Sequence, residues 1–180
     1  MIARAQVRSG DAVSPIEMQQ QMRDALALLQ RGDAAGAEAA LGPVLGIAPH
    51  DPNVRHLSAL IRRAQGDHFG ALLDFDAALA AAPNAVRIHI NRAALLAELG
   101  RHQEALAGLD AAAGLGVDDS ALWRARGVAL SHLERHAEAT AAFDRVLALD
   151  PNDATLAPIV RAPCWRTAVS KRRSLTTTCC

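Results

Sequence analysis

The sequence predicts an all-α protein built from consecutive antiparallel helix pairs. Apolar residues recur at helical spacing in successive stretches, and glycine or proline interrupts each stretch. The stretches also resemble one another at a fixed period, which is the signature of a repeat architecture. The composition agrees, because alanine is abundant and aromatic residues make up only 3% of the chain. Alanine has the highest helix propensity and allows neighbouring helices to approach closely.

The apolar positions predict helices in an order that runs through most of the chain. Met18, Met22, Leu26 and Leu29 begin the pattern at near-helical spacing. Glycine-containing turns end the first helix of each pair, and prolines end most of the second helices. The expected helices span about residues 16–30, 34–47, 54–65, 71–82, 86–99, 104–113, 121–133 and 137–149.

Four series of residues keep a common spacing of 34 positions. They are the turn residues Gly32, Gly66, Gly100 and Glu134, the small residues Ala37, Ala71, Ala105 and Ala139, the large apolar residues Leu41, Phe75, Leu109 and Phe143, and the end positions Pro49, Pro83, Val117 and Pro151. The glycine is expected at positive φ where the chain turns back. The alanine allows close helix approach, and the large residue four positions later fills the space on the same face.

These residues make the chain resemble the tetratricopeptide repeat (TPR) family, with repeats at 18–51, 52–85, 86–119 and 120–153. The fourth repeat carries the family's series as Trp123, Gly127, Ala139, Phe143 and Pro151. The third departs from it at Val117, and the first has Ala25 and Leu28 where glycine and an aromatic residue are usual. The resemblance implies a right-handed α-solenoid, the TPR superhelix, whose first helices line a concave groove.

The predicted domain organisation has three parts. Residues 1–14 form a flexible lead-in, and residues 15–153 form the repeat array. Residues 154–180 are expected to be a short cap helix, broken by Pro158, and a disordered tail. This tail contains all three cysteines, Cys164, Cys179 and Cys180.

The resemblance also places a set of side chains in the groove and implies that they bind a peptide. This surface mixes arginine, histidine and small apolar residues, and arginine pairs bidentately with carboxylates, so a partner with an acidic group is expected. The alternative is that these charges solvate the helices or pair with neighbouring acids. The predicted groove residues are Asn53, His56, Leu60, Arg63, Arg87, Ile90, Ala94, Arg124, Val128 and His132.

One subclass of the family grips the C-terminal carboxylate of chaperones with lysine, asparagine and arginine. The matching positions here are mostly apolar, including Met22, Leu26 and Leu60, and Asn91 is a single agreement. Binding of chaperone tails is therefore not predicted.

No group of residues predicts catalysis, a cofactor or a bound metal. His132 and His136 fall at an inter-helix turn and thus on different helices, unlike the histidines of the zinc-protease motif, which share one helical face. Trp123 occupies a packing position of the repeat. Phosphate loops, paired carboxylates and nucleophile elbows are also absent from the sequence. We therefore expect a protein that is not an enzyme.

The charge balance and the hydropathy favour a protein in solution. The 19 basic and 19 acidic residues give no net charge, which provides no support for binding to nucleic acid or a membrane surface. The sequence shows neither a secretory signal nor a membrane span, so a cytoplasmic location is expected. Nearly every base is arginine, which suggests GC-rich codons and a bacterial source.

The predicted function is a non-catalytic protein–protein interaction module that binds a peptide or helix segment. An alternative is that the repeats are the N-terminal array of a larger or truncated bacterial enzyme, of the sulfotransferase, glycosyltransferase or hydroxylase type. The abrupt change of composition after about residue 154 favours this alternative. Weak self-association through the C-terminal end is also expected, because the cap is short.

Overall fold

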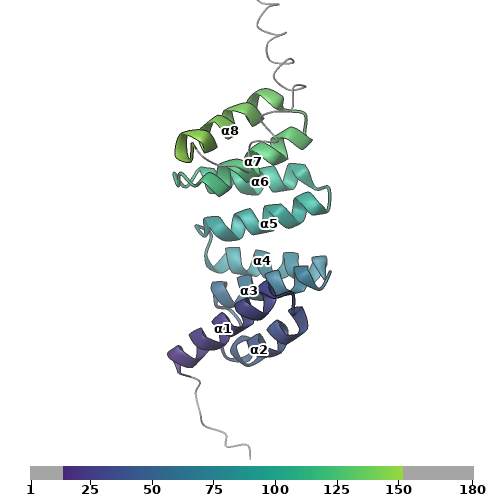
Figure 1. Cartoon of the computed structure of the whole chain (residues 1–180), viewed down its shortest axis with the longest axis vertical. Coiled ribbons are helices and arrows are strands. Elements are labelled where there is room, and N and C mark those ends of the chain that lie inside the picture. The colour runs from purple at the N-terminus through teal and green to yellow at the C-terminus, as the bar shows by residue number, and fades with distance from the viewer. Residues whose placement is uncertain (1–13, 152–180) are drawn as a thin grey trace, which may run out of the picture. The chain divides into compact units, whose positions relative to one another are not determined.

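A computed structural model describes residues 14–151, which form eight α-helices and no strand (Figure 1). The cysteine-containing tail and nearly all of the predicted lead-in and cap lie outside these residues. The bounds match the predicted helices closely in most cases, although α4 begins earlier than expected. The helices are α1 Pro15–Gln30, α2 Ala34–Ile47, α3 Pro52–Ala64, α4 His68–Ala81, α5 Val86–Glu98, α6 His102–Ala113, α7 Ser120–His132 and α8 His136–Leu149.

The chain divides between Ala81 and Ala82 into two compact units. In the first unit, α1 packs against α2, α2 against α3 and α3 against α4, and α1 also contacts α3. In the second unit, α5 to α8 pack in the same order, and α5 contacts α7. Each unit therefore contains two helix pairs in which contacts join only near neighbours, as in repeat proteins generally.

The turn inside each helix pair has the same backbone geometry. At the end of α1, Gly32 has a φ of 84°, its N–H donates to the carbonyl of Leu29 at 2.9 Å, and the N–H of Asp33 donates to Leu28 at 3.0 Å. This is the Schellman motif, which satisfies the last carbonyls of a helix. The motif recurs with Gly66, Gly100 and, at φ 57°, Glu134. The predicted positive φ at the turn glycines is confirmed.

The second helices of the first unit begin with an aspartate cap. The Asp33 carboxylate accepts a hydrogen bond from the Gly36 N–H at 2.8 Å, and Asp67 accepts one from Gly70 at 2.9 Å. A Cβ atom on Gly36 would lie 2.2 Å from the nearer Asp33 oxygen, and one on Gly70 would lie 2.1 Å from that of Asp67. A side chain at Gly36 or Gly70 would therefore displace the aspartate carboxylate from its present position.

The second unit replaces this cap with an ion pair. The positions of Asp33 and Gly36 are taken by Arg101 and Glu104, which form two hydrogen bonds at 2.7 and 2.6 Å. Arg135 and Glu138 repeat the arrangement at 2.8 and 2.7 Å. The bonds from Arg101 and Arg135 lower the pKa of the Glu104 and Glu138 carboxyls, respectively.

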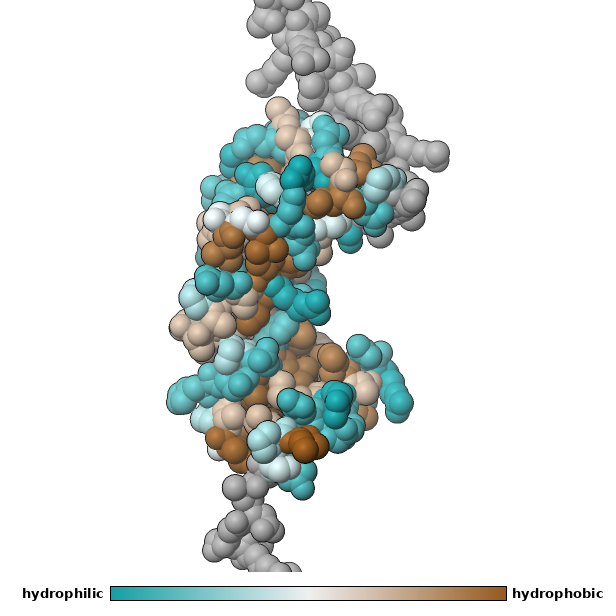
Figure 2. Space-filling model, turned by 90° about the vertical axis from the view of Figure 1, so that its left-hand side faces the viewer, coloured by the Kyte–Doolittle hydropathy of each residue, from teal (hydrophilic) through white to brown (hydrophobic). Residues whose placement is uncertain are grey.

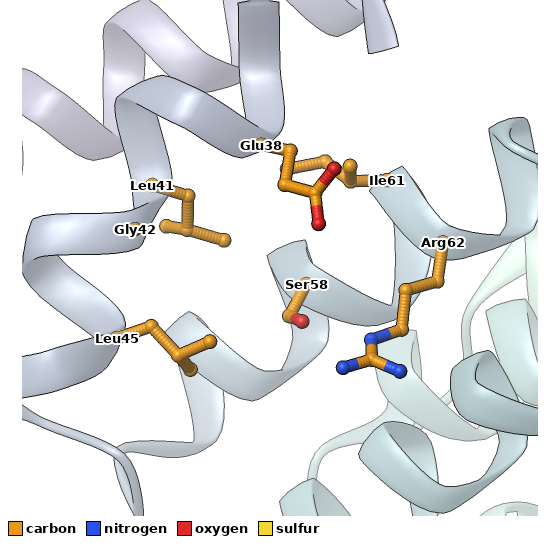
Figure 3. A pocket seen from close by; sticks show the side chains of 7 residues that line it. All are labelled: Glu38, Leu41, Gly42, Leu45, Ser58, Ile61 and Arg62. Carbon is orange, nitrogen blue, oxygen red and sulfur yellow. The ribbon is translucent and has the colours of Figure 1, made fainter. Parts of the chain in front are cut away.

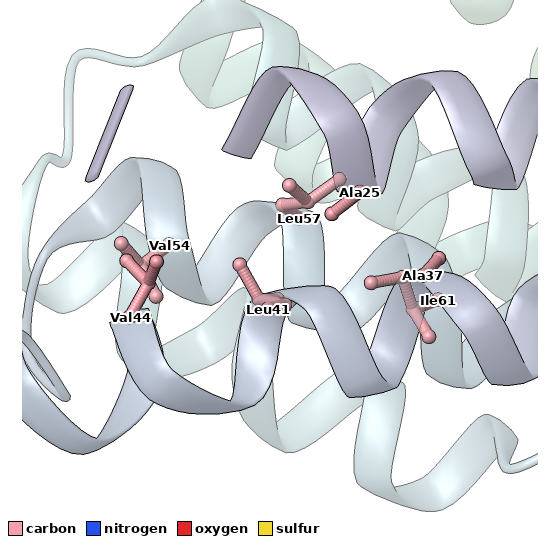
Figure 4. Packing of buried hydrophobic residues seen from close by; sticks show 7 residues of the cluster. All are labelled: Ala25, Ala37, Leu41, Val44, Val54, Leu57 and Ile61. Carbon is pink, nitrogen blue, oxygen red and sulfur yellow. The ribbon is translucent and has the colours of Figure 1, made fainter. Parts of the chain in front are cut away.

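Burial follows the predicted repeat positions in both units. The alanines at the closest helix approach are no more than 4% exposed, and the large apolar residues four positions later are no more than 3% exposed. Figure 4 shows one cluster of the first unit, in which α1, α2 and α3 contribute Ala25, Ala37, Leu41, Val44, Val54, Leu57 and Ile61. In the second unit, a Cβ on Gly127 would lie 2.5 Å from Cε1 of Phe143, so α7 and α8 meet where glycine is required.

Candidate peptide-binding surfaces

Four of the predicted groove residues lie on one face of α3 in the first unit. Asn53 is exposed at the start of the helix, and His56, Leu60 and Arg63 follow at helical spacing and are half-buried. The His56 ring lies 6.0 Å from the ring of Phe75, at an interplanar angle of 46°. The His56 ring thus packs against a side chain of α4, which restricts its position on this face.

The other six predicted residues lie on α5 and α7, which contact each other in the second unit. Arg87 is exposed and forms no ion pair with another described residue, whereas Arg124 is half-buried and has a partner. Ile90, Ala94 and Val128 are half-buried beside them. This face therefore combines small apolar surface with one exposed guanidinium.

His132 is the exposed last residue of α7, and its ring stacks on that of another histidine in a geometry that does not suit metal binding. The His102 and His132 rings lie 4.3 Å apart at 3° to each other. A metal ion binds in the plane of an imidazole ring, and nitrogen lone pairs of parallel stacked rings do not converge on one point. His136 begins α8, so the two histidines of the sequence cluster belong to different helices, as predicted. Residues 14–151 contain no group of three or more side chains that could hold a metal ion.

Trp123 is half-buried and helps to fasten the loop that follows α6. Its indole N–H donates to the Asp118 carboxylate at 2.8 Å, and the Arg126 guanidinium lies 5.6 Å from the ring centroid. Arg145 of α8 donates to the same carboxylate. The bonds from Arg145 and Trp123 lower the pKa of Asp118. This loop is where Val117 replaces the repeat's proline, so side-chain bonds support a segment that proline fixes elsewhere.

A pocket in the first unit was not predicted from the sequence. It has a volume of about 130 Å³ and lies between α2 and α3 (Figure 3). Both helices contribute to its walls, and the lining residues are Glu38, Leu41, Gly42, Leu45, Ser58, Ile61 and Arg62. The signal that could have revealed it is that Gly42 and Ser58 both depart from the residue types at the corresponding positions of later repeats.

The polar side of this pocket is tied to a buried carboxylate, which was also not predicted. Asp74 of α4 is 4% exposed and accepts hydrogen bonds from Ser58 and Arg55, both at 2.7 Å. The Nε atom of Arg62 lies 3.0 Å from the same carboxylate. Two arginines and a hydroxyl thus compensate the burial of the charge.

Exposed apolar side chains are not confined to the predicted groove faces. Phe69 and Leu73, one turn apart on α4, are 75% and 55% exposed. Figure 2 shows apolar and hydrophilic residues interspersed on the face turned toward the viewer. Among the described residues, no helix is both long and apolar enough to cross a membrane.

Comparison with known proteins gives one match to a family model. Residues 120–153 match the family model described as tetratricopeptide repeat, which are the bounds of the predicted fourth repeat. No curated protein matches the chain in sequence. The helix pairs and their near-neighbour contacts define a helical repeat protein. The family match over residues 120–153 and the structural neighbours described next show that the described residues have the fold of tetratricopeptide repeat proteins.

Similar solved structures share this fold at low sequence identity. The solved structure from the functional characterization of Pseudomonas aeruginosa pilF has a TM-score of 0.73 at 23% identity, over 77% of this chain and 64% of that one. MamA from Desulfovibrio magneticus RS-1 gives 0.65 at 21% identity, over 78% of each chain. The first TPR of Spaghetti (RPAP3), bound to the HSP90 peptide SRMEEVD, gives 0.62 at 22% identity, over 67% of this chain and 94% of that one. The chain thus spans less than two thirds of the pilF structure.

Proposed function

We propose that this protein is a non-catalytic interaction module that binds a peptide or helix segment of a protein partner. Each unit has its own proposed surface, which is the α5 and α7 face in the second unit and the α3 face in the first. None of the ten predicted residues is buried, so their side chains are accessible to a partner. A neighbour of the same fold binds the HSP90 peptide SRMEEVD, which supports a peptide as the class of ligand.

The observation that carries the proposal is the state of Arg87. Most other arginines of residues 14–151 are engaged with side chains or backbone of the chain, whereas Arg87 is exposed and forms no ion pair with a described residue. A guanidinium presents several N–H donors in a fixed plane that matches a carboxylate. The adjoining Ile90 and Ala94 provide apolar surface for the rest of the peptide. An acidic side chain or a C-terminal carboxylate is therefore the expected anchor of the partner.

The test compares acidic peptides with peptides in which every Asp and Glu is replaced by the amide. Fluorescence anisotropy should show binding of acidic peptides to the full chain, and Arg87→Ala with Arg124→Ala should weaken it at least about tenfold, since a charge-assisted hydrogen bond contributes about 1.5–3 kcal/mol. The matched control is Arg23→Ala with Arg31→Ala, which removes the same charge from exposed positions of the first unit. Equal affinity of both double variants would contradict the proposal.

The alternative function, an N-terminal array of a larger bacterial enzyme, stays a prediction. It is tested by the coding sequence downstream of residue 180, where a catalytic domain in any reading frame would support it. The expected cytoplasmic location and the bacterial source likewise stay predictions.

A further inference from the structure

The junction between the two helix pairs of the second unit is closed by an ion pair. Asp110 of α6 and Arg126 of α7 approach within 2.6 Å, between the Asp110 Oδ1 and the Arg126 Nε atoms. The guanidinium of Arg126 also covers the face of Trp123. At this junction Arg126 of the chain itself pairs with Asp110 and lies over Trp123.

The corresponding junction of the first unit lacks both partners of this pair. The residues 68 positions before Asp110 and Arg126 are Gly42 and Ser58. A Cβ on Gly42 would meet no atom within 4 Å, so the space beside it is open. The Ser58 hydroxyl turns instead to Asp74, at 2.7 Å. The pocket between α2 and α3 therefore lies where the repeat elsewhere places its arginine and aspartate.

The lining of this pocket has the chemistry that an arginine side chain needs. Leu41, Leu45 and Ile61 form apolar walls on two helices (Figure 3). Aliphatic stems of long cationic side chains pack on such surfaces while the charged end reaches a polar group. The volume of about 130 Å³ is of the size that one side chain occupies.

Glu38 provides the matching charge. Its only described partner is the uncharged amide of Gln65, which donates to one carboxylate oxygen at 2.7 Å. A carboxylate has about four lone-pair sites, so this oxygen pair can accept further donors. Arg62, the cation in the lining, is already neutralised by Asp67 and Asp74. The pocket thus holds one carboxylate without a cationic partner.

We propose that this pocket binds an arginine side chain of a protein partner. The aliphatic stem lies against Leu41, Leu45 and Ile61, and the guanidinium pairs with Glu38. The partner's arginine thus takes the place of the arginine that the other junction has at Arg126 and that this junction lacks. Acidic residues outnumber arginines between residues 14 and 81, and lysine is absent there, so the surroundings also favour a cation. The site differs from the proposed peptide surface in both position and charge preference.

The probe is N-acetyl-arginine N-methylamide, an arginine with uncharged ends, added to the ¹⁵N-labelled full chain. We expect saturable NMR shifts at Gly42 and neighbouring lining residues with a Kd in the millimolar range, on the order of what one side chain supplies. The norleucine and glutamate analogues should produce no saturable shifts at these residues. Absence of a response to the arginine probe, or an equal response to the norleucine probe, would overturn the proposal.

Two variants test the mechanism. Gly42→Asp with Ser58→Arg restores the repeat's own pair, fills the pocket and should abolish the shifts. Glu38→Gln changes one exposed side chain and should weaken binding about tenfold or more, because a charge-assisted contact is lost. The control Asp24→Asn makes the same charge change on α1 and should leave the affinity unaltered. If the double variant does not fold, Glu38→Gln decides alone, and unchanged affinity in that variant refutes the site.

A second copy of the chain is the competing occupant. In that case the wild-type protein would sediment as a dimer, the arginine probe would dissociate it, and the filled pocket of the double variant would give a monomer. We expect a wild-type sedimentation coefficient that the double substitution does not change. A substitution-dependent change would contradict a heterologous partner.

Discussion

Glu134 is the one residue of the four inter-helix turns that occupies the left-handed region without being glycine. Its φ of 57° matches the role of Gly32, Gly66 and Gly100, and its N–H donates to Ser131 at 3.1 Å as theirs donate to the equivalent carbonyls. A side chain in this conformation brings Cβ close to the backbone carbonyl. The fourth turn therefore carries a local conformational cost that the other three avoid.

We predict that Glu134→Gly stabilises the protein by about 0.5–1 kcal/mol, because relief of the left-handed strain exceeds the entropy that glycine loses on folding. Chemical denaturation of the full chain measures this as a rise in the midpoint at unchanged slope. The reverse change, Gly100→Glu, is the matched control and should destabilise the third turn by a similar amount. A destabilising effect of Glu134→Gly would show that its side chain contributes a contact that offsets the strain.

At the scale of elements, the loop between α6 and α7 shows how one helix pair is joined to the next without the usual proline. Gly116 adopts a φ of 73°, and the Asp118 side chain is held by Trp123 of α7 and Arg145 of α8. The loop is thus fixed by three groups that lie on successive elements rather than by a restricted φ. These exposed bonds make the loop sensitive to the ionisation of one carboxyl.

We predict that Asp118→Asn lowers the midpoint of thermal unfolding near neutral pH. The folded pKa of Asp118 lies below its ordinary value of 3.8, so the charged form contributes stability that is fully present above that value. The contribution declines as the pH falls below 3.8 and is lost once the pH passes the lowered pKa. The difference in midpoint between wild type and variant should therefore shrink in acid. A difference independent of pH would exclude the ionised carboxyl as its cause.

Much of the element-level structure follows from the sequence, and particular residues show where the prediction ends. The 34-residue register located the turns and the buried alanines because each has a steric reason that acts locally. The pocket beside Gly42 and Ser58 was not predicted, because it forms only where two small residues on different helices face each other. Asp74 was likewise missed, because nothing in its local pattern shows that Arg55 and Ser58 of another helix surround it. The sequence also does not show which groove arginines are engaged within the chain. Arg124 has a partner there, whereas Arg87 forms no ion pair with a described residue.

At the scale of the whole molecule, α8 is the last described helix, and its exposed surface carries small apolar residues beside charged ones. Ala137, Ala141 and Ala148 are exposed along it, and Leu149 is 39% exposed. Exposed apolar residues at the end of a repeat array provide surface that another chain can contact. This surface is the location at which self-association is expected.

We predict weak, concentration-dependent self-association of the full chain at tens of micromolar, measured by sedimentation velocity. Ala141→Glu places a charge in the middle of the α8 surface and should restore a monomer, because burial of an unpaired charge is unfavourable. Asp24→Glu, which lengthens an exposed side chain on α1, should leave the association unchanged. A wild-type chain that sediments as a monomer throughout this range would refute the prediction.

The two kinds of helix cap give the units different responses to ionic strength. In the first unit, Asp33 and Asp67 accept bonds from backbone N–H groups directly beside them, at distances where mobile ions do not intervene. In the second unit, the Arg101–Glu104 and Arg135–Glu138 pairs lie in solvent, where added salt screens their attraction with a Debye length of about 3 Å at 1 M. We therefore expect concentrated salt to weaken the starts of α6 and α8 more than that of α2, where the cap bond is to a backbone N–H alone.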